Sequence, residues 1–546
     1  MMIFDIVVVG GGVAGLMAAI EAKSSSNRVA VITKGNLFKS NSSLASGGIN
    51  AVLDPNNKSE IDKHIADTYE GGYGLGDKKA ISYMCYQAGR IVRKINKYGV
   101  EFDKDEAGNI AQRSFGGGSS KRTCYVGDKT GGAITGALIK KAKSMGVDFV
   151  VNNYVMNITK LDKNVSGVVA IRRMDSSVVV YPAKAVILAG GGYAGIYRGF
   201  ATNAPDYTGD LHAIALRAGL RLKDMEFVQF HPTGLAKGSY LVSEAARGEG
   251  GYLINSDGER FVDELETRDV VSRAILKEFE KGHEVFIDLR HLSSEHIETK
   301  LPSLFKSAYN MMGIDVSKEI LPVKPLAHYS MGGIESTMTQ TSIKGLFVCG
   351  ECANVGVHGA NRLGGNSLLE GAVFGELAGS KAKKYAQSRD FLPIDYNIVV
   401  KDQNIVDKIF DMDTTKNFNA MRISLGKSMF ENCGISKNEA GLIKAYDYIR
   451  YLRAEANTLH CIDKGRNNNV ELIAILELKN ALEVSEAIIL TSMERKESRG
   501  AAHRDDYLVS DAKLKGSVYI SEPTKGYFKL AFMNDGWLDR VRKFFM

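Results

Sequence analysis

The sequence predicts an α/β fold in which a Rossmann-like nucleotide-binding domain is interrupted by an inserted α+β capping unit and followed by a helical domain. Three observations predict it. A β-branched run near the N-terminus leads directly into a glycine-rich turn. Two later strand-like runs also end in glycines. Towards the C-terminal end the glycine clusters thin out, and apolar residues recur with helical spacing.

The first strand and its turn have the context of a dinucleotide-binding motif. Residues 3–9 have the pattern of a buried strand, and a GxGxxG motif starts at Gly10, before an apolar helix pattern. The N-terminus of that helix would receive a pyrophosphate. The second strand, residues 28–33, ends in Thr33 and Lys34, where a ribose-binding acid usually stands, and this disfavours NAD. A tight turn without a ligand is the plainer alternative.

Further glycine-rich segments indicate one discontinuous nucleotide domain. Residues 40–49 are rich in hydroxyl side chains and end in glycines, and their place after the second strand favours cofactor contact over a plain surface loop. Strand-to-glycine junctions recur at 185–192 and 346–350. We expect a discontinuous nucleotide domain made of residues 1–221 and 344–395, with a capping and substrate domain at 222–343. A helical domain at 396–510 and a tail at 511–546 would follow.

The inserted unit carries the polar side chains of an expected anion site, which are His231, Ser243, Glu244, Arg247, Arg268 and His328. Each has a plainer interpretation alone, because a single buried histidine is usually structural and a single arginine usually forms a surface ion pair. Arg362 lies in the segment HGANRLGGNSL, where glycines allow close approach of the backbone. Its guanidinium offers a rigid fork of donors to a carboxylate. Together these residues predict a cage for a dicarboxylate beside the cofactor.

Composition excludes several other classes of protein. The chain has 546 residues and a net charge of +7, with no run of basic residues, so nucleic acid is not an expected partner. Six cysteines in a chain of this length do not make a disulfide framework. The single CxxC motif, Cys349 to Cys352, supplies too few ligands to bind zinc or an iron–sulfur cluster. We therefore expect no metal site and a structural role for this pair, with an oxidant-sensitive thiol as the alternative. The absence of a leader or a long apolar stretch predicts a cytoplasmic protein.

These motifs resemble the flavoprotein subunit of the succinate dehydrogenase and fumarate reductase family. They occur in order as GGGxAG, HPTG, SEAxRGEGG, RD, HYSMGG and HGANRLGGNSLLE, and the resemblance extends to about residue 507. It implies an FAD-dependent oxidoreductase acting on a CH–CH bond, in which hydride passes between flavin N5 and fumarate or succinate. Arg268 would transfer the proton, with Glu244 and Arg247 as its relay. The substrate carboxylates would be held by His231, Ser243, Glu244, His328 and Arg362.

The resemblance also implies which residues hold FAD, namely Gly10, Gly12, Gly15, Asp210, Glu351, Ser367 and Leu368. By their position after the second strand or beside Ser367 we add Thr33, Lys34, Ser40, Asn41, Ser42, Gly47, Gly48 and Asn366. Many membrane-bound relatives join FAD covalently to a histidine where this chain has Asn41. An asparagine cannot form that bond, so we expect non-covalent FAD and a preference for fumarate reduction.

Two alternatives remain open on the sequence. L-aspartate oxidase resembles this chain in most motifs, converts L-aspartate to iminoaspartate with oxygen or fumarate as acceptor, and carries an acidic residue near the substrate ammonium. Here the corresponding segment is RSFGG, so Phe115 and Gly116 are expected beside the substrate and offer no such charge. The second alternative is a flavin-binding interaction subunit with little turnover, which would not require Arg268.

The resemblance implies partner subunits as well. An iron–sulfur subunit would carry electrons, with a membrane anchor or a soluble donor beyond it, so the protein is expected at the inner face of the cell membrane through its partners. The tail from Asp506 onward departs from the family's usual ending. Residues 518–520 and 527–532 predict a hairpin, and 537–545 form an amphipathic stretch. We expect that stretch to pack on the body in preference to a membrane, and the tail is a candidate for partner contact.

Overall fold

The computed structural model describes residues 2–413, 416–524 and 526–534. Its central sheet has seven strands, in the order β6-β2-β1-β9-β8-β7, with β16 also paired to β9. Their bounds are β1 Phe4–Val9, β2 Val29–Ile32, β6 Asp148–Val150, β7 Asn153–Leu161, β8 Asn164–Arg172, β9 Ser177–Leu188 and β16 Leu346–Val348. Because β1, β9 and β16 are parallel neighbours, all three strand-to-glycine junctions meet at one edge of this sheet.

Strand β9 is longer than the apolar run at 185–189 predicted. Its first half, to Pro182, pairs antiparallel with β8, and its second half pairs parallel with β1 from Ala183 onward. The valine-rich first half is the kind of β-branched stretch that either pairing accepts, so the sequence carries no sign of the change of partner.

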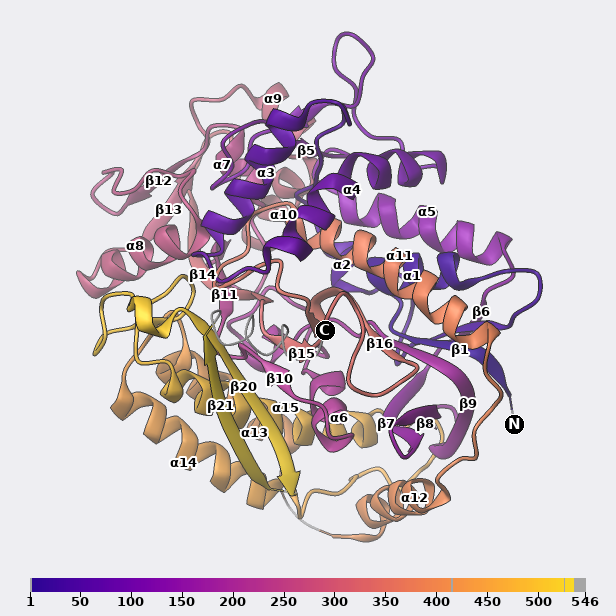
Figure 1. The fold of residues 1–546 in the computed structure, drawn as a ribbon. Helices are drawn as coiled ribbons and strands as arrows, with labels where there is room; N and C mark the ends of the chain where they lie inside the picture. The colour runs from indigo at the N-terminus through magenta and orange to yellow at the C-terminus, as the bar shows by residue number, and fades with distance from the viewer. Residues whose placement is uncertain (1, 414–415, 525, 535–546) are drawn as a thin grey trace.

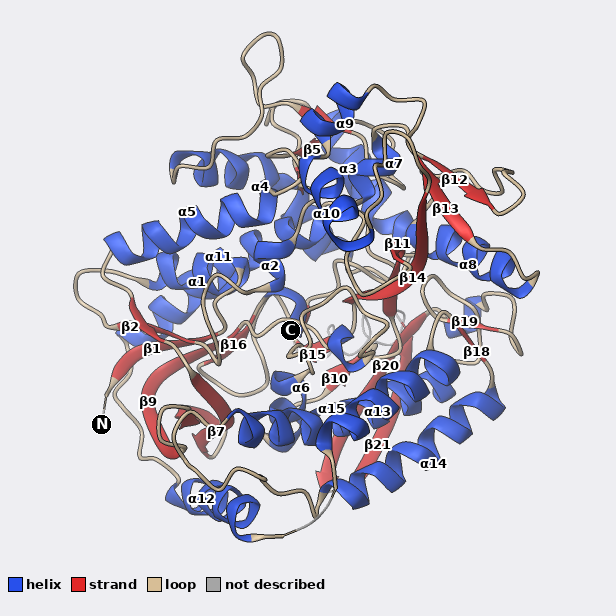
Figure 2. Ribbon diagram, turned by 180° about the vertical axis from the view of Figure 1, so that it is seen from behind, coloured by secondary structure: helices blue, strands red, loops and turns tan. Residues whose placement is uncertain are grey.

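Helices are stacked on one side of this sheet, some on its strands and others on those helices (Figures 1 and 2). They are α1 Val13–Ala22, α3 Lys58–Gly71, α4 Lys78–Lys97, α5 Thr130–Ser144 and α11 Asn366–Gln387. Helix α11 lies so close to α1 that a Cβ added at Gly375 or Gly379 would stand 2.4 Å or 2.2 Å from the carbonyl oxygen of Ala14 or Ala18. Glycines at these two positions therefore set the spacing between the helices.

The inserted region has its own four-stranded antiparallel sheet, in the order β11-β14-β13-β12. Its elements are β11 Val228–Leu235, α7 Glu244–Gly248, β12 Tyr252–Asn255, α8 Arg268–Glu280, β13 Val285–Asp288, α9 Ser294–Lys300, α10 Pro302–Met312 and β14 Leu321–Ser330. A separate apolar core fills this region, from Leu235 to Val323. The pairing of β11 with β14 shifts register between His231 and Gly234. The shift lies at Pro232 of the HPTG motif, because proline has no backbone N–H to donate to a regular ladder.

The C-terminal region is mainly helical and shares the apolar core of the central sheet. Its helices are α12 Tyr396–Asp411, α13 Phe418–Cys433, α14 Glu439–Ala456 and α15 Val470–Glu494. The apolar residues that recur with helical spacing, among them Leu472 and Ile489, are buried, but α15 also buries Glu477, Asn480 and Glu486. The helix therefore runs through the interior with both faces covered, beside α13 and α14 in Figure 1.

The predicted hairpin is present as β20 Gly516–Thr524 and β21 Tyr527–Asn534. It extends a five-stranded sheet with β10 Leu222–Lys223, β15 Gly333–Glu335 and β17 Ala353–Asn354. The predicted amphipathic stretch at 537–545 lies outside the described residues.

Short elements complete the described chain: α2 Asn41–Leu44, β3 Ile49–Asn50, β4 Gln112–Arg113, β5 Thr123–Cys124, η1 Ala194–Ile196, α6 Asp210–Arg217, η2 Gly350–Cys352, β18 Ser436–Lys437, β19 His503–Arg504 and η3 Ala512–Leu514. Within the described ranges, no helix is both long and apolar enough to cross a bilayer.

Candidate active site

A cavity of about 730 Å³ opens at the edge of the central sheet where the glycine junctions meet. Most residues expected to hold the cofactor line it, namely Gly10, Gly12, Thr33, Lys34, Ser40, Asn41, Ser42, Asp210, Glu351, Ser367 and Leu368. The first residue of helix α1, Val13, lines the cavity. Its amide donates a hydrogen bond of 3.2 Å to Ser42 Oγ. The cavity is large enough for a dinucleotide, with a helix N-terminus in place for phosphate.

Four of the expected cofactor residues do not line the cavity. A Cβ on Gly15 would stand 2.0 Å from Gly10 O, so this glycine closes the turn against the helix. Gly47 packs on the Phe115 ring, and Gly48, at φ +150°, packs on β5. The Asn366 side chain is occupied inside the protein, since its amide donates to Thr68 Oγ1 at 3.0 Å.

Asn41, which the sequence predicts beside the cofactor, lines the cavity. Asn41 Oδ1 accepts a hydrogen bond of 3.1 Å from the Ala204 amide, and the Asn41 amide donates to Tyr207 Oη at 2.8 Å. Its buried Nδ2 has no protein partner. The side chain thus presents an unused donor, and no nucleophilic nitrogen, to whatever occupies the cavity.

A buried polar cluster stands at one end of the cavity, where His328 of β14 lines the wall. Its rings and guanidiniums come from four separate elements. His231 of β11 lies 5.1 Å from His328 between ring centroids. Arg362, from the loop before α11, stacks 4.3 Å above the Tyr329 ring. Arg268 begins α8, and Glu244 begins α7. The structure therefore brings together residues that lie far apart in the sequence.

Arg268 is held rigidly by two partners. Glu244 Oε2 accepts from Arg268 Nε at 2.9 Å and also from Nη2, while Nη1 donates to Gln229 Oε1 at 3.0 Å. The other oxygen of Glu244 accepts from the Gly116 amide at 2.8 Å, which brings the loop of Phe115 and Gly116 to this cluster. Ser243 caps α7, because its Oγ accepts from the Ala245 amide at 3.2 Å.

Two arginines in this region retain unused donors. Arg247 Nη1 donates to Glu264 O, whereas Arg247 Nε and Nη2 are buried without a protein partner. Arg362 Nε is likewise buried and unpaired. Buried donors without partners are rare in folded proteins unless water or a ligand completes them.

The electrostatics of the cluster favour an anion. Burial, together with nearby Arg268, lowers the pKa of Arg362 to about 9. Burial and Arg268 likewise push the pKa values of His231 and His328 well below the usual 6.5, so both rings are neutral near pH 7. Burial opposes ionisation of Glu244, but Arg268 and Arg247 hold its pKa below the usual value. The guanidiniums of Arg247, Arg268 and Arg362 thus gather around the Glu244 carboxylate, and the unpaired donors of Arg247 and Arg362 remain for an anionic ligand.

Gln229 and Tyr329 belong to the site, although they are not among the residues predicted from the sequence. Gln229 bridges the cluster, because its amide donates to Arg362 O at 2.7 Å while its oxygen accepts from Arg268. It stands two residues before His231 on β11, so the period of a strand places both on one face. The two-residue spacing from His231 was the signal that could have identified Gln229. The sequence does not show it clearly, because every residue of β11 is buried and the strand lacks an alternation of polar and apolar residues.

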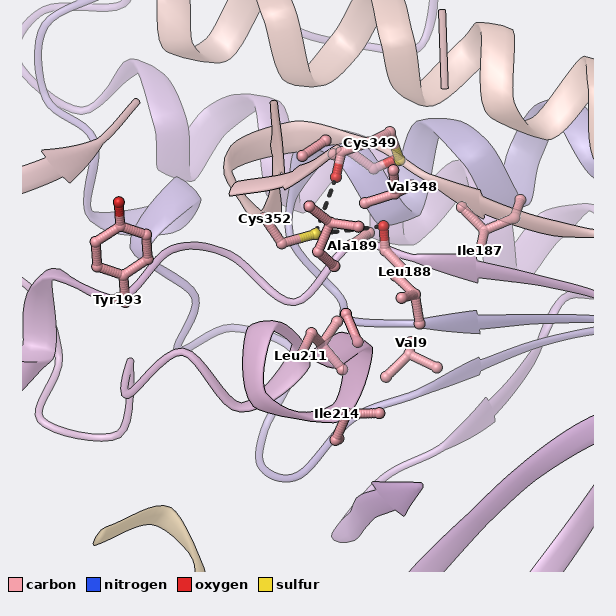
Figure 3. Close-up of a cluster of buried hydrophobic side chains, with 14 of the residues drawn as sticks. Val9, Ile187, Leu188, Ala189, Tyr193, Leu211, Ile214, Val348, Cys349 and Cys352 are labelled. Atoms are coloured by element: carbon pink, nitrogen blue, oxygen red, sulfur yellow. Dashed lines mark hydrogen bonds between the residues drawn. The ribbon is translucent and has the colours of Figure 1, made fainter. Parts of the chain in front are cut away.

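The CxxC lies behind the cavity in an apolar layer, among Val9, Leu188 and Leu211 (Figure 3). Both thiols are buried and free. Cys352 Sγ donates to Leu188 O at 3.4 Å, and burial raises its pKa to about 12. These contacts support the structural interpretation of the pair. Among the described residues, no group of His, Cys, Asp and Glu could hold a metal ion.

Comparison with known proteins assigns the family. A family model described as an FAD binding domain matches residues 5–368, and one described as the C-terminal region of fumarate reductase flavoprotein matches residues 422–533. The succinate dehydrogenase flavoprotein subunit of Rickettsia conorii is 37% identical over 543 residues, which cover 92% of this chain and 90% of that protein. The chain belongs to the succinate dehydrogenase and fumarate reductase flavoprotein family.

Other members of the family agree with this assignment. The fumarate reductase flavoprotein subunit of Proteus vulgaris is 36% identical and covers 92% of this chain and 89% of its own. A solved E. coli quinol fumarate reductase FrdA chain superposes with a TM-score of 0.93 at 32% identity, covering 98% of this chain and 97% of that one. Mycobacterium smegmatis Sdh1, solved in complex with UQ1, gives a TM-score of 0.85 at 33% identity, covering 97% and 94%.

Family membership makes the chain an FAD-dependent oxidoreductase that acts on a CH–CH bond. The cavity fits this cofactor, with the glycine turn, the helix N-terminus and the unpaired Asn41 amide on its walls. One expectation needs correction. The C-terminal family model continues to residue 533, so the hairpin of β20 and β21 belongs to the family pattern, and the resemblance does not stop near 507.

Proposed function

We propose that this chain is the flavoprotein subunit of an enzyme that interconverts fumarate and succinate, with a preference for fumarate reduction. The observation that carries the proposal is the buried Arg268–Glu244 pair set among His231, His328 and Arg362 at the end of the FAD cavity. This cluster offers buried guanidinium and imidazole donors to the two carboxylates of a four-carbon substrate. When bound, FAD exchanges a hydride with the substrate.

The protein's own contribution is first to hold both carboxylates. Arg362 has an unpaired Nε and is kept in place by stacking on Tyr329. The neutral rings of His231 and His328 offer donors without adding charge, and His328 is oriented because its Nδ1 lies 2.7 Å from Thr202 Oγ1. Clamping the two ends of the substrate fixes the alkene, so that the reacting carbons are aligned before the chemistry.

Its second contribution is a proton at a defined position. Glu244 fixes the plane of the Arg268 guanidinium, and Gln229 fixes one of its edges. An arginine is a weak acid, with a pKa above about 12 in water. A carbanion forming on the substrate next to the Arg268 guanidinium would favour transfer of its proton. Glu244, which contacts Arg268 directly, is the group that would restore the proton.

FAD is proposed to bind without a covalent link, because Asn41 stands where a bonding histidine would be needed. Denaturation with trichloroacetic acid tests this point. All flavin absorbance should then appear in the supernatant. Flavin retained in the washed pellet would contradict it.

The enzyme is proposed to act with an iron–sulfur subunit and a membrane anchor, and so to reach the membrane through partners. Solved relatives support this, since one is a quinol fumarate reductase with menaquinol molecules and another is an Sdh1 complex with UQ1. Affinity purification of the chain from its own cells, followed by analysis for iron and acid-labile sulfide, would identify the iron–sulfur partner. Purification of the chain free of both would count against it.

A dye-linked assay tests the activity. Reduced viologen with fumarate, an oxidising dye with succinate, and the same dye with L-aspartate are run on one preparation. Turnover with fumarate should exceed that with succinate, and L-aspartate should give none. Turnover with L-aspartate alone would establish the aspartate oxidase alternative, and no turnover with any substrate would favour the interaction subunit.

A further inference from the structure

Helix α15 of the C-terminal region reaches the wall of the FAD cavity at the end of β2. Lys34, which follows β2, extends its ammonium to Asp210 Oδ2 at 2.8 Å and to Glu477 Oε1 at 2.9 Å. It also donates to the Asp206 carbonyl. Lys34, Asp206 and Asp210 line the cavity, whereas Glu477 lies behind them on α15. A single cation therefore ties the cavity wall to a helix more than four hundred residues away in sequence.

A second residue of α15 completes the contact. Asn480 Nδ2 donates to Asp210 Oδ1 at 3.0 Å and to Tyr154 Oη at 2.7 Å. Its carbonyl oxygen accepts from Arg217 Nη1 at 3.0 Å, which fixes the orientation of the amide. Tyr154 Oη in turn donates to Asp210 Oδ1 at 3.0 Å. Asp210 is thus held by partners on both of its oxygens, and one of these partners belongs to α15.

Glu477 is a shared partner of two cations in this cluster. Its second oxygen lies 3.5 Å from Arg422 Nη1 of α13, and Arg422 also donates to the Pro205 carbonyl beside the cavity. Two cations, Lys34 and Arg422, face two carboxylates, Asp210 and Glu477. Removing the charge of Glu477 would take from Lys34 one of the two carboxylates that contact it and would leave Arg422 without its buried partner. Breaking a buried pair from one side is strongly unfavourable.

The place of the cluster in the fold indicates which part of FAD it serves. In a Rossmann fold the residue after the second strand contacts the ribose of the adenosine half, usually through an acid. Here that residue is Lys34, and its ammonium is turned towards carboxylates.

We infer that Glu477 and Asn480 are positioning residues for the adenosine half of FAD, and that they act through Lys34 and Asp210. The inference rests on the non-covalent FAD proposed above. With no covalent bond to retain the cofactor, helix α15 supplies part of the hold that keeps it in the flavin domain.

The test measures binding of FAD, and separately of ADP, to apoprotein by isothermal titration calorimetry. Glu477→Gln should weaken both ligands by the same factor of at least tenfold, which corresponds to about 1.4 kcal/mol. Glu486→Gln is the matched control. Glu486 lies on the same helix and is also buried, but its partners are Arg450 and Arg453 of α14, which do not line the FAD cavity. Its substitution should leave both dissociation constants within twofold.

Urea unfolding of each apoprotein separates positioning from support of the fold. If the two glutamine variants lose similar stability and only Glu477→Gln loses FAD and ADP, the inference holds. Equal ligand affinity in both variants would overturn it, and so would a loss of FAD affinity without a loss of ADP affinity. Should Glu477→Gln fail to fold, Lys34→Met replaces it with the same expected tenfold effect on both ligands. The acid-precipitation test above shows independently whether FAD is covalent, so its failure cannot be mistaken for a failure of the positioning role.

Discussion

At the scale of single residues, the site depends on buried charge that the protein does not fully neutralise. Arg247, Arg268 and Arg362 all lie near the Glu244 carboxylate, and two of them keep unpaired nitrogens. Such an arrangement is costly in an empty protein, because buried charge without partners is strongly disfavoured. Its presence is understandable if a dianion completes it during turnover.

Replacing Arg268 by alanine should abolish most turnover, because no other group in the cluster can donate a proton at that point. We expect the rate with fumarate to fall by at least about a hundredfold, the usual contribution of a positioned acid. Arg290→Ala is the control, since Arg290 forms an exposed ion pair with Asp288 in the same region. The assignment of the acid is wrong if Arg268→Ala retains more than a tenth of wild-type turnover while FAD content is unchanged.

A buried carboxyl behind the site predicts a pH dependence of stability. Burial, and then the nearby Glu351 carboxylate, raises the pKa of Glu370 from 4.5 to about 8. Because the folded pKa lies above the unfolded one, this group stabilises the fold most below pH 4.5, and the stabilisation is lost as pH rises to about 8. Between pH 5 and pH 8 the wild-type apoprotein should lose about 2–4 kcal/mol more stability than Glu370→Gln. Urea unfolding at several pH values measures this, and identical slopes would refute the shifted pKa.

At the scale of elements, some positions were predictable and others were not. The strands ending in glycine junctions were visible because glycine clusters interrupt an apolar run, as after Val9. The inward arrangement of α15 was not visible. A buried glutamate cannot be told from an exposed one by sequence alone. Its burial is explained only by its partners in other elements, as Lys34 explains the burial of Glu477. The site residues that belong to motifs were predicted from the sequence. Gln229 was not, because its role depends on contacts with Arg268 and Arg362 from other parts of the chain.

The close packing of α11 on α1 makes a testable claim about glycine. Gly379→Ala would place a methyl 2.2 Å from Ala18 O, so it should destabilise the protein by about 2 kcal/mol. Gly136→Ala on α5 meets no atom within 4 Å, and it should stabilise by about 0.5–1 kcal/mol through helix propensity. Both values come from urea unfolding. Equal effects of the two substitutions would show that the α1–α11 contact is looser than described.

At the scale of the whole molecule, the inserted region is joined to the flavin domain by a helix cap. The buried carboxylate of Asp128 accepts from the Ser303 amide at 2.7 Å, from Ser303 Oγ at 2.7 Å and from the Leu304 amide at 3.3 Å. It therefore caps α10 from outside the region to which α10 belongs. Asp128 and Ser303 both line the FAD cavity, so this contact closes one side of it.

Removing this cap should loosen α10 without unfolding the protein. Asp128→Ala is expected to cost about 1–2 kcal/mol at the helix start and to speed hydrogen exchange there. Exchange measured by mass spectrometry should rise in peptides covering residues 302–312. Asp395→Ala removes an ordinary cap from α12, where Asp395 accepts from Asn397, and should leave those peptides unchanged. An unchanged α10 in Asp128→Ala would mean that the cap does not hold the two parts together.

The central claim is that a four-carbon dicarboxylate is clamped between His231, His328 and Arg362 with Arg268 beside its reacting carbons. A crystal structure of the FAD-loaded protein with fumarate tests it most directly. The account predicts both carboxylates within hydrogen-bonding distance of the histidines and Arg362, and a guanidinium nitrogen of Arg268 next to an alkene carbon. Fumarate bound elsewhere, or bound with Arg268 turned away from it, would contradict the account.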